Sequence, residues 1–108
     1  MSFHVFVTEG ASSEIRSILR WIRERSPAGA LTWFRGWQNT LQTLRDRADK
    51  LGLAPESEIH PEAIRQIVFK TRRGRSYRAL FIIRDSNVFV LHVRGPGQNL
   101  VEPDEIHP

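Results

Sequence analysis

The chain of 108 residues contains no cysteine and only one tyrosine. The absence of cysteine excludes a disulfide framework, a thiolate metal site and a cysteine nucleophile, and it fits a reducing cytosol. The four histidines show no close ligand spacing, so the sequence predicts no structural metal. No segment approaches the roughly twenty apolar residues of a membrane span, and the N-terminus lacks a signal-peptide pattern. We therefore expect a cytoplasmic protein without a membrane partner.

The positive charge of the chain is concentrated in one stretch. Between Arg65 and Arg94, eight cationic side chains stand against a single acid, Asp85. This stretch therefore carries +7, and because the formal net charge is +4, the remaining residues carry −3. Most of the cations are arginines, which suit planar, bidentate binding of phosphate or carboxylate. Such a surface favours nucleic acid or an acidic protein as the partner.

The length and the apolar content predict one domain. A chain of 108 residues with 40% hydrophobic residues can build one modest core and no second one. We therefore expect a single domain over residues 1–108, with an acidic and mobile tail over about residues 98–108.

Two amphipathic helices are predicted after a short strand over residues 3–7. The first covers residues 11–25, with Ser12 or Ser13 as its N-cap. Ser26-Pro27 then ends this helix and starts the next, which runs to about residue 50. Apolar residues follow the second helix at steps of three and four: Ala30, Phe34, Trp37, Leu41, Leu44 and Ala48. So short a connection makes the two helices antiparallel, and their narrow apolar stripes need a sheet to cover them.

Three strands are predicted in the second half of the chain, over residues 64–72, 77–84 and 88–94. Short turns at residues 74–76 and 85–87 join them as antiparallel neighbours. The preceding residues 53–62, with their prolines and glutamates, indicate an irregular acidic connection. The sequence thus predicts an α+β fold.

Alternation along these strands sorts their side chains onto two faces. The face expected under the helices carries Ile67, Phe69, Phe81, Ile83, Phe89, Leu91 and Val93. The opposite face carries Gln66, Lys70, Arg72, Arg78, Arg84, His92 and Arg94, together with Val68, Leu80, Ile82, Val88 and Val90. This second face is predicted to be a half-apolar, cationic groove for RNA or a peptide. Clustered cations destabilise a fold unless a ligand or an acidic neighbour compensates them, although arginines also lie over apolar surface by their stems.

The order of strand, two helices and a three-stranded meander resembles the RelE/ParE superfamily, the toxins of type II toxin–antitoxin modules and plasmid stabilisation systems. The most telling segments are Phe69-Lys70-Thr71-Arg72, Tyr77-Arg78-Ala79-Leu80-Phe81 and Val88-Phe89-Val90-Leu91-His92-Val93-Arg94-Gly95. The resemblance covers almost the whole chain. It implies a β-α-α-β-β-β fold in which a helical hairpin packs on a mostly antiparallel four-stranded sheet, and an acidic antitoxin as the cognate partner.

In the RelE branch, the resemblance implies an mRNA endonuclease that acts in the ribosomal A site without a cofactor. Three residues match the family's basic positions, and Arg94 lies near a fourth: Lys70, Arg72 and Arg78. The predicted RNA-binding set adds two neighbours, Arg73 and Arg75. Metal-free RNA cleavage also needs a general base and a general acid. His92 is the candidate for this role, because no tyrosine follows Tyr77. Lys70 is a second candidate for the base if its pKa is lowered.

The alternatives left open by the sequence differ in mechanism. The ParE branch shares the fold and inhibits DNA gyrase by binding, and this chain suits it if Lys70 and Arg78 are structural. A degenerate, non-toxic member that binds an acidic partner is a third possibility. The sequence slightly favours the RelE-like nuclease. Among the tryptophans, Trp37 is expected in the core, whereas an exposed Trp33 would mark a partner surface.

Overall fold

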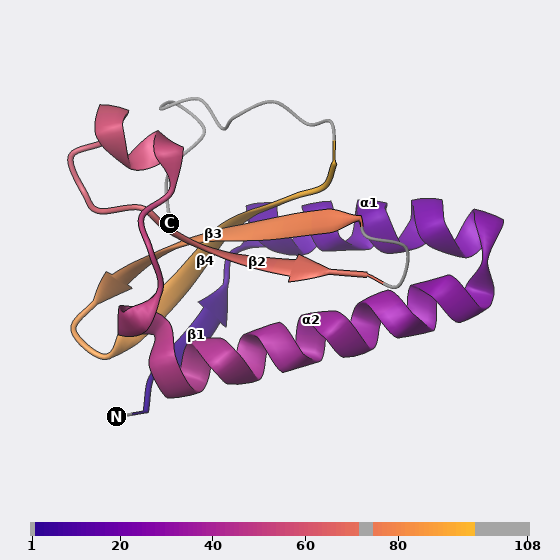
Figure 1. Ribbon diagram of the computed structural model, residues 1–108, viewed down its shortest axis with the longest axis horizontal. Coiled ribbons are helices and arrows are strands. Elements are labelled where there is room, and N and C mark those ends of the chain that lie inside the picture. Colours follow the sequence, from indigo (N-terminus) through magenta and orange to yellow (C-terminus); the bar gives the residue numbers. More distant parts are fainter. Residues whose placement is uncertain (1, 72–74, 97–108) are drawn as a thin grey trace.

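The computed structural model describes residues 2–71 and 75–96. The helices and strands are β1 (His4–Val7), α1 (Glu9–Arg25), α2 (Pro27–Arg47), β2 (Arg65–Lys70), β3 (Ser76–Arg84) and β4 (Asn87–Arg94), shown in Figure 1. Two 3₁₀ turns, η1 (Ala48–Lys50) and η2 (Pro55–Ile59), lie between α2 and β2. This order confirms the predicted β-α-α-β-β-β arrangement. Arg72, Arg73 and the tail from residue 98 lie outside the described residues.

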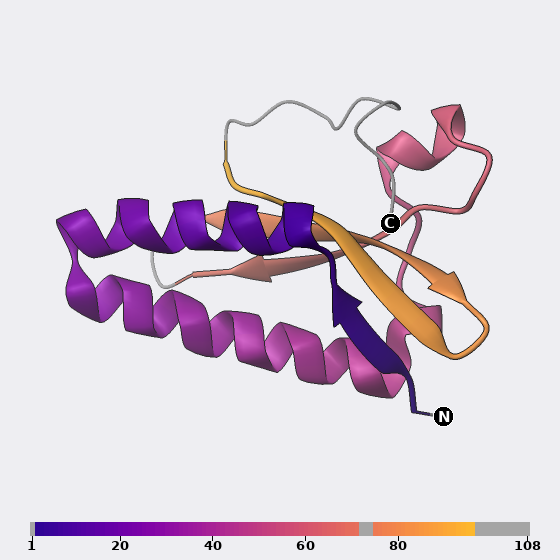
Figure 2. The same cartoon turned by 180° about the vertical axis from the view of Figure 1, so that it is seen from behind.

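The strands form a four-stranded sheet in the order β1-β4-β3-β2. β2, β3 and β4 are antiparallel neighbours, and β1 lies parallel to β4 at the edge. The helices run antiparallel and side by side along one face of the sheet (Figures 1 and 2). The predicted helical hairpin on a mostly antiparallel sheet is thus confirmed. No helix within the described ranges is long and apolar enough to cross a membrane.

Thr8 lies between β1 and α1 and is the N-cap of the helix. Its hydroxyl oxygen accepts a hydrogen bond from the backbone N–H three residues later at 3.3 Å, and its hydroxyl donates to the Val90 carbonyl at 2.9 Å. One side chain therefore caps the helix and ties it to β4. The prediction that Ser12 or Ser13 is the N-cap is wrong, because the helix already begins at Glu9.

The junction of the two helices follows the prediction. Ser26 caps α2, because its hydroxyl oxygen accepts a hydrogen bond from the Gly29 N–H at 3.0 Å, and Pro27 occupies the first turn. A Cβ at Gly29 would lie 3.1 Å from the Ser26 Oγ and 3.3 Å from a methyl carbon of Ile22. Glycine at this position therefore allows the tight turn between the helices.

The buried stripe of α2 differs from the predicted one. It consists of Trp33, Trp37, Thr40 and Leu44. Trp37 is 4% exposed, as expected for a core residue, and Trp33 is 1% exposed, whereas Phe34 is 40% exposed. The prediction is wrong for Phe34 because the ring of Trp33 packs against Trp37, Phe69 and Tyr77 in one aromatic cluster. Contact with β2 and β3 thus selects the side of α2 that is buried.

Four residues of β4 lie on the opposite face from the predicted one. Val88 and Val90 belong to the core under the helices, whereas Phe89 and Leu91 belong to a cluster on the other face. The pairing of β3 with β4 shifts by one residue at a β-bulge, and alternation inverts there. Val93, which lies beyond the bulge, faces the helical core as predicted.

The face of the sheet away from the helices is also buried. Leu80, Ile82 and Leu91 are each at most 2% exposed, and they pack with Ala54 and Ile64. The segment between α2 and β2 was predicted to be irregular, but it carries η2 and joins its two ends by a hydrogen bond from the Ala54 N–H to the Ile64 carbonyl at 2.8 Å. This segment and the apolar cluster occupy the face that was predicted to be an open groove.

Candidate functional site

The fold brings together some of the cationic residues that the sequence singled out. Arg78 and Arg94 are direct partners in the register of β3 and β4. Lys70 ends β2 and is exposed, and Arg75 precedes β3 and is also exposed. Their predicted catalytic and RNA-binding roles, like those of the undescribed Arg72 and Arg73, stay predictions.

Arg78 is held by a buried carboxylate. Its Nη1 donates to Oε1 of Glu56 at 2.9 Å, its Nη2 donates to Oε2 at 2.5 Å, and Nη1 also lies 3.3 Å from the Gln66 amide oxygen. The Glu56 side chain has no exposed surface, and that of Arg78 is 19% exposed. Pro55 begins η2 and so sets the position of Glu56 over β3. The Arg78 guanidinium is therefore neutralised within the fold by a bidentate ion pair.

Glu14 of α1 compensates charge at the end of β4. Its carboxylate lies 3.1 Å from His92 Nδ1 and 3.2 Å from Arg94 Nη1. It also accepts a hydrogen bond from the Val93 backbone N–H at 3.0 Å. The side chains of His92 and Arg94 are only 12% and 17% exposed. Glu14 therefore fastens α1 to β4 and engages both side chains that the sequence assigned to the cationic face.

Arg84 and Glu62 form a third pair at the other end of β3. The guanidinium donates two hydrogen bonds to the carboxylate, one of them from Nε at 3.2 Å. This hydrogen bonding holds the pKa of Glu62 below its usual value. The side chains are 47% and 37% exposed, so water screens this pair much more than the pair at Arg78.

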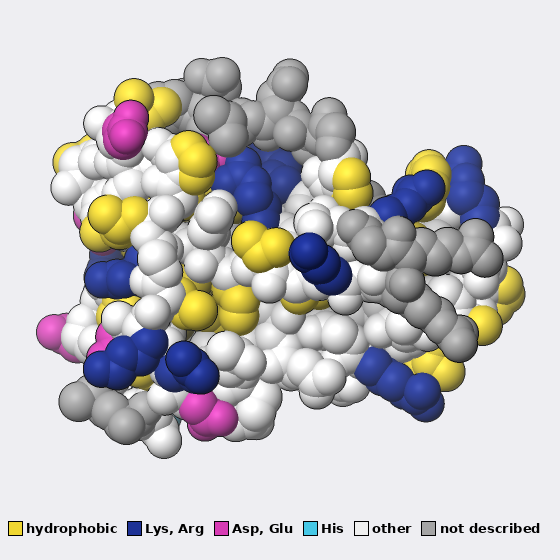
Figure 3. All heavy atoms as spheres, in the orientation of Figure 1, with side chains coloured by type: hydrophobic (Ala, Val, Ile, Leu, Met, Phe, Trp, Pro, Cys, Tyr) yellow, Lys and Arg dark blue, Asp and Glu magenta, His cyan; other side chains and the backbone are white. Residues whose placement is uncertain are grey.

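The described cations on one face of the molecule lie in separate groups. Figure 3 shows separate groups of Lys and Arg side chains on the face it presents, with uncharged surface between them. Of the predicted RNA-binding residues, Lys70 and Arg75 have no carboxylate partner among residues 2–71 and 75–96. Acids of the same chain therefore compensate Arg78, Arg84 and Arg94 of the predicted cationic face, whereas Lys70 and Arg75 stay exposed.

Sequence reasoning did not identify the three acids that compensate this face, Glu14, Glu56 and Glu62. Glu56 lies in a stretch that reads as an acidic linker, and Glu14 lies in an ordinary amphipathic helix. The only available signal was indirect, because clustered guanidiniums cost free energy that carboxylates of the same chain can offset.

This arrangement limits the chemistry of the sheet face. Cleavage of RNA without a metal needs cations that can turn toward the charged phosphorane, besides an acid and a base. Arg78 would have to leave a buried carboxylate to do so, and uncovering that carboxylate is costly. No three His, Asp or Glu residues in the described part of the chain are placed to hold a metal ion. The ion pairs instead suit a structural role, in which they fasten η2 and α1 to the sheet.

Comparisons with known proteins agree with the architecture. No model of a known protein family matches the chain, and no curated protein matches it. Among solved structures, a chain of the chromosomal ParDE toxin–antitoxin system from P. aeruginosa is similar, with a TM-score of 0.65 and 18% sequence identity. The match covers 87% of this chain and 96% of that chain. The likeness therefore spans nearly the whole chain, which has the fold of a chain from a ParDE toxin–antitoxin system.

Proposed function

We propose that this chain is the toxin of a type II toxin–antitoxin module and that it acts by binding its target rather than by cutting RNA. The shared fold with a chain of a ParDE system and the hairpin residues that resemble the RelE/ParE toxins support the first part. The ParE branch of that superfamily inhibits DNA gyrase, so gyrase is the proposed target.

The observation that carries the mode of action is the pairing of Arg78 with Glu56. The sequence slightly favoured the nuclease because three cations matched the RNA-cleaving positions. In the fold, the two Nη nitrogens of Arg78 donate hydrogen bonds to the fully buried carboxylate of Glu56. A second candidate cation, Arg94, shares Glu14 with His92. Arg78 is thus engaged within the structure, which meets the condition for the ParE branch at one of its two residues; the other, Lys70, is exposed.

An acidic antitoxin is the proposed partner, and the outer side of the helical hairpin offers it a surface. A groove of about 490 Å³ between α1 and α2 is lined by apolar and cationic side chains. Leu31 and Phe34 in this groove are 52% and 40% exposed, and Arg20 and Arg23 flank them. An amphipathic segment with acidic flanks would cover the apolar side chains and offset the arginines.

The test is induced expression in a bacterial host without a partner protein, following growth, protein synthesis and DNA replication in one culture. We expect replication to stop while mRNA stays intact. Purified protein should then inhibit supercoiling by gyrase in vitro. Translation arrest with mRNA cut in translated frames, and unaffected gyrase, would instead establish the nuclease.

Alanine substitutions at two lysines also distinguish a binding mechanism from RNA cleavage. Lys70 is an exposed cation of the predicted catalytic set, and Lys50 is the only other lysine of the chain. Under the binding mechanism, Lys70→Ala and Lys50→Ala should have equal toxicity. Loss of toxicity in Lys70→Ala alone would support RNA cleavage. Normal growth with folded wild-type protein would mean that the chain keeps the fold without the toxicity.

A further inference from the structure

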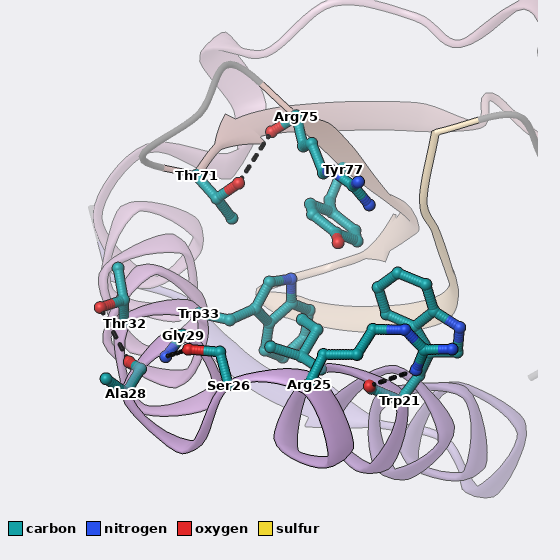
Figure 4. A pocket seen from close by; sticks show the side chains of 11 residues that line it. Trp21, Arg25, Ser26, Ala28, Gly29, Thr32, Trp33, Thr71, Arg75 and Tyr77 are labelled. Carbon is teal, nitrogen blue, oxygen red and sulfur yellow. Dashed lines mark hydrogen bonds between the residues drawn. The ribbon is translucent and has the colours of Figure 1, made fainter.

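A pocket of about 560 Å³ lies where the turn between α1 and α2 meets the hairpin of β2 and β3 (Figure 4). Three aromatic rings and two guanidiniums line it, from Trp21, Trp33, Tyr77, Arg25 and Arg75. The pocket shares no lining residue with the ion pairs of the sheet face. It is therefore separate from the ion pairs that carry the proposed mode of action.

The two guanidiniums of this pocket converge on one indole ring. The Arg25 guanidinium carbon lies 3.8 Å from the centroid of the Trp21 ring, and that of Arg75 lies 5.6 Å from it. Arg25 donates a hydrogen bond to the Trp21 carbonyl at 2.8 Å, and its acidic contact is a long one of 4.0 Å to the exposed Glu24. Arg75 has no acidic partner within the described residues. Both positive charges therefore lie at the same ring, and an anion in contact with them would offset their charge.

A buried donor without an acceptor faces the same pocket. Trp33 is 1% exposed, and its Nε1 has no hydrogen-bond partner among the described residues. Figure 4 shows this nitrogen on the edge of the indole that faces Tyr77, whose hydroxyl also points into the pocket. A buried N–H needs an acceptor, and nearly all buried polar groups have one. Next to this buried donor, the pocket carries two guanidiniums and no carboxylate among its described lining residues.

Arg75 acts electrostatically on the inner part of the pocket. Burial raises the pKa of Tyr77, and the nearby Arg75 charge partly opposes that rise. The field of a guanidinium at the pocket wall is thus felt at the phenol group. A ligand in this space would meet flat apolar rings and cationic groups together.

We propose that this pocket binds a nucleotide, with the base against Trp21, the exposed ring of the pocket, and the phosphate held by Arg25 and Arg75. The guanidinium fork matches phosphate oxygens, and bases stack on tryptophan rings. The volume lies in the range of small-molecule sites, about 300–1,000 Å³. A carboxylate of an acidic peptide would satisfy the guanidiniums but brings no flat ring for the aromatic wall.

The experiment titrates the full-length protein with adenosine monophosphate by isothermal calorimetry. We expect binding, and we expect Trp21→Leu and Arg75→Gln to weaken it by about tenfold each, since each removes a stacking surface or a charge-assisted contact. Arg35→Gln is the matched control, because it removes the same charge from an exposed position of α2 that lines neither this pocket nor the groove between the helices. The control should bind within about twofold of the wild type.

Titrations with other phosphate compounds identify the kind of ligand that the pocket binds. Inorganic phosphate should bind much more weakly than adenosine monophosphate. A short 5′-phosphorylated RNA that competes better than the mononucleotide would identify the end of a strand as the source, and a weaker one would identify a free nucleotide. Equal binding of phosphate and adenosine monophosphate would overturn the proposal. No binding at millimolar concentration, or equal affinities in Arg75→Gln and Arg35→Gln, would also overturn it. Binding of an acidic peptide in the absence of nucleotide binding would overturn it in favour of a peptide site.

Discussion

Replacing Arg78 by methionine is expected to destabilise the protein severely. The substitution removes a guanidinium that makes two hydrogen bonds to Glu56 and leaves a carboxylate whose side chain has no exposed surface. Breaking a buried ion pair by removing one partner costs about 3–5 kcal/mol. Since domains of this size are stable by about 5–15 kcal/mol, the loss is a large part of the total.

The matched control lies on the same strand. Arg84 of β3 pairs with Glu62 with a similar hydrogen-bond pattern, but both side chains are at least 37% exposed. Exposed ion pairs contribute about 0–1 kcal/mol, so Arg84→Met should change the free energy of unfolding by no more than that. The comparison isolates burial, because the residue type, the strand and the kind of partner are the same.

A double variant separates the loss of charge from the loss of packing. Replacing both partners, as Glu56→Leu with Arg78→Met, removes the uncompensated charge and leaves apolar side chains beside the cluster of Leu80, Ile82 and Leu91. Such replacements of buried pairs are often neutral or stabilising. We therefore expect the double variant to regain most of the stability that Arg78→Met loses.

Urea denaturation at neutral pH, followed by circular dichroism, measures these differences, and thermal melting covers variants too unstable for extrapolation. A loss in Arg78→Met no larger than that in Arg84→Met would refute the reasoning, because it would mean that η2 does not cover the sheet in solution. The structural role of Arg78, and with it the preference for a binding mechanism, would then be lost.

Three further predictions concern other parts of the chain. Because burial raises the pKa of Tyr77, the protein should lose stability as the pH rises above about 10, where the unfolded chain releases the phenol proton first. Absorbance of the single tyrosine reports this titration, and Arg75→Gln should raise the pKa further; an ordinary or lower value in that variant would contradict the pocket geometry. Thr8→Ala should cost about 0.5–2 kcal/mol in urea denaturation, whereas Ser12→Ala should cost almost nothing, and the reverse order would place the helix start elsewhere. Phe34→Ala should weaken binding of a cognate antitoxin by about tenfold in calorimetry without lowering stability, because this ring is exposed on the isolated chain; unchanged affinity would move the antitoxin to another surface.

The sequence by itself determined the elements and their order. Periodicities of 3.6 and 2 residues, the Ser26-Pro27 junction and the short turn after Arg84 are local signals, and each element depends mainly on its own residues. The helical hairpin, the antiparallel meander and the burial of Trp37 followed from them. The helix start at Thr8 was missed because its hydroxyl also bonds β4, a contact that sequence neighbours do not reveal.

Only the tertiary structure decided which acids pair with the cationic side chains and which face of the sheet they occupy. A single β-bulge inverted the faces of four residues in β4, which the alternation of an isolated strand cannot show. Glu56 reaches Arg78 across 22 positions and Glu14 reaches His92 across 78, so nothing in their local sequence marks them as partners. The pocket is likewise lined by residues from the end of α1 and from the start of β3, which are far apart in the sequence. Local periodicity specifies which face of an element is apolar, but ion pairs and pockets depend on packing between distant segments. Because of that packing, the face predicted to be an open cationic groove is covered, and acids of the same chain pair with Arg78, Arg84 and Arg94 on it.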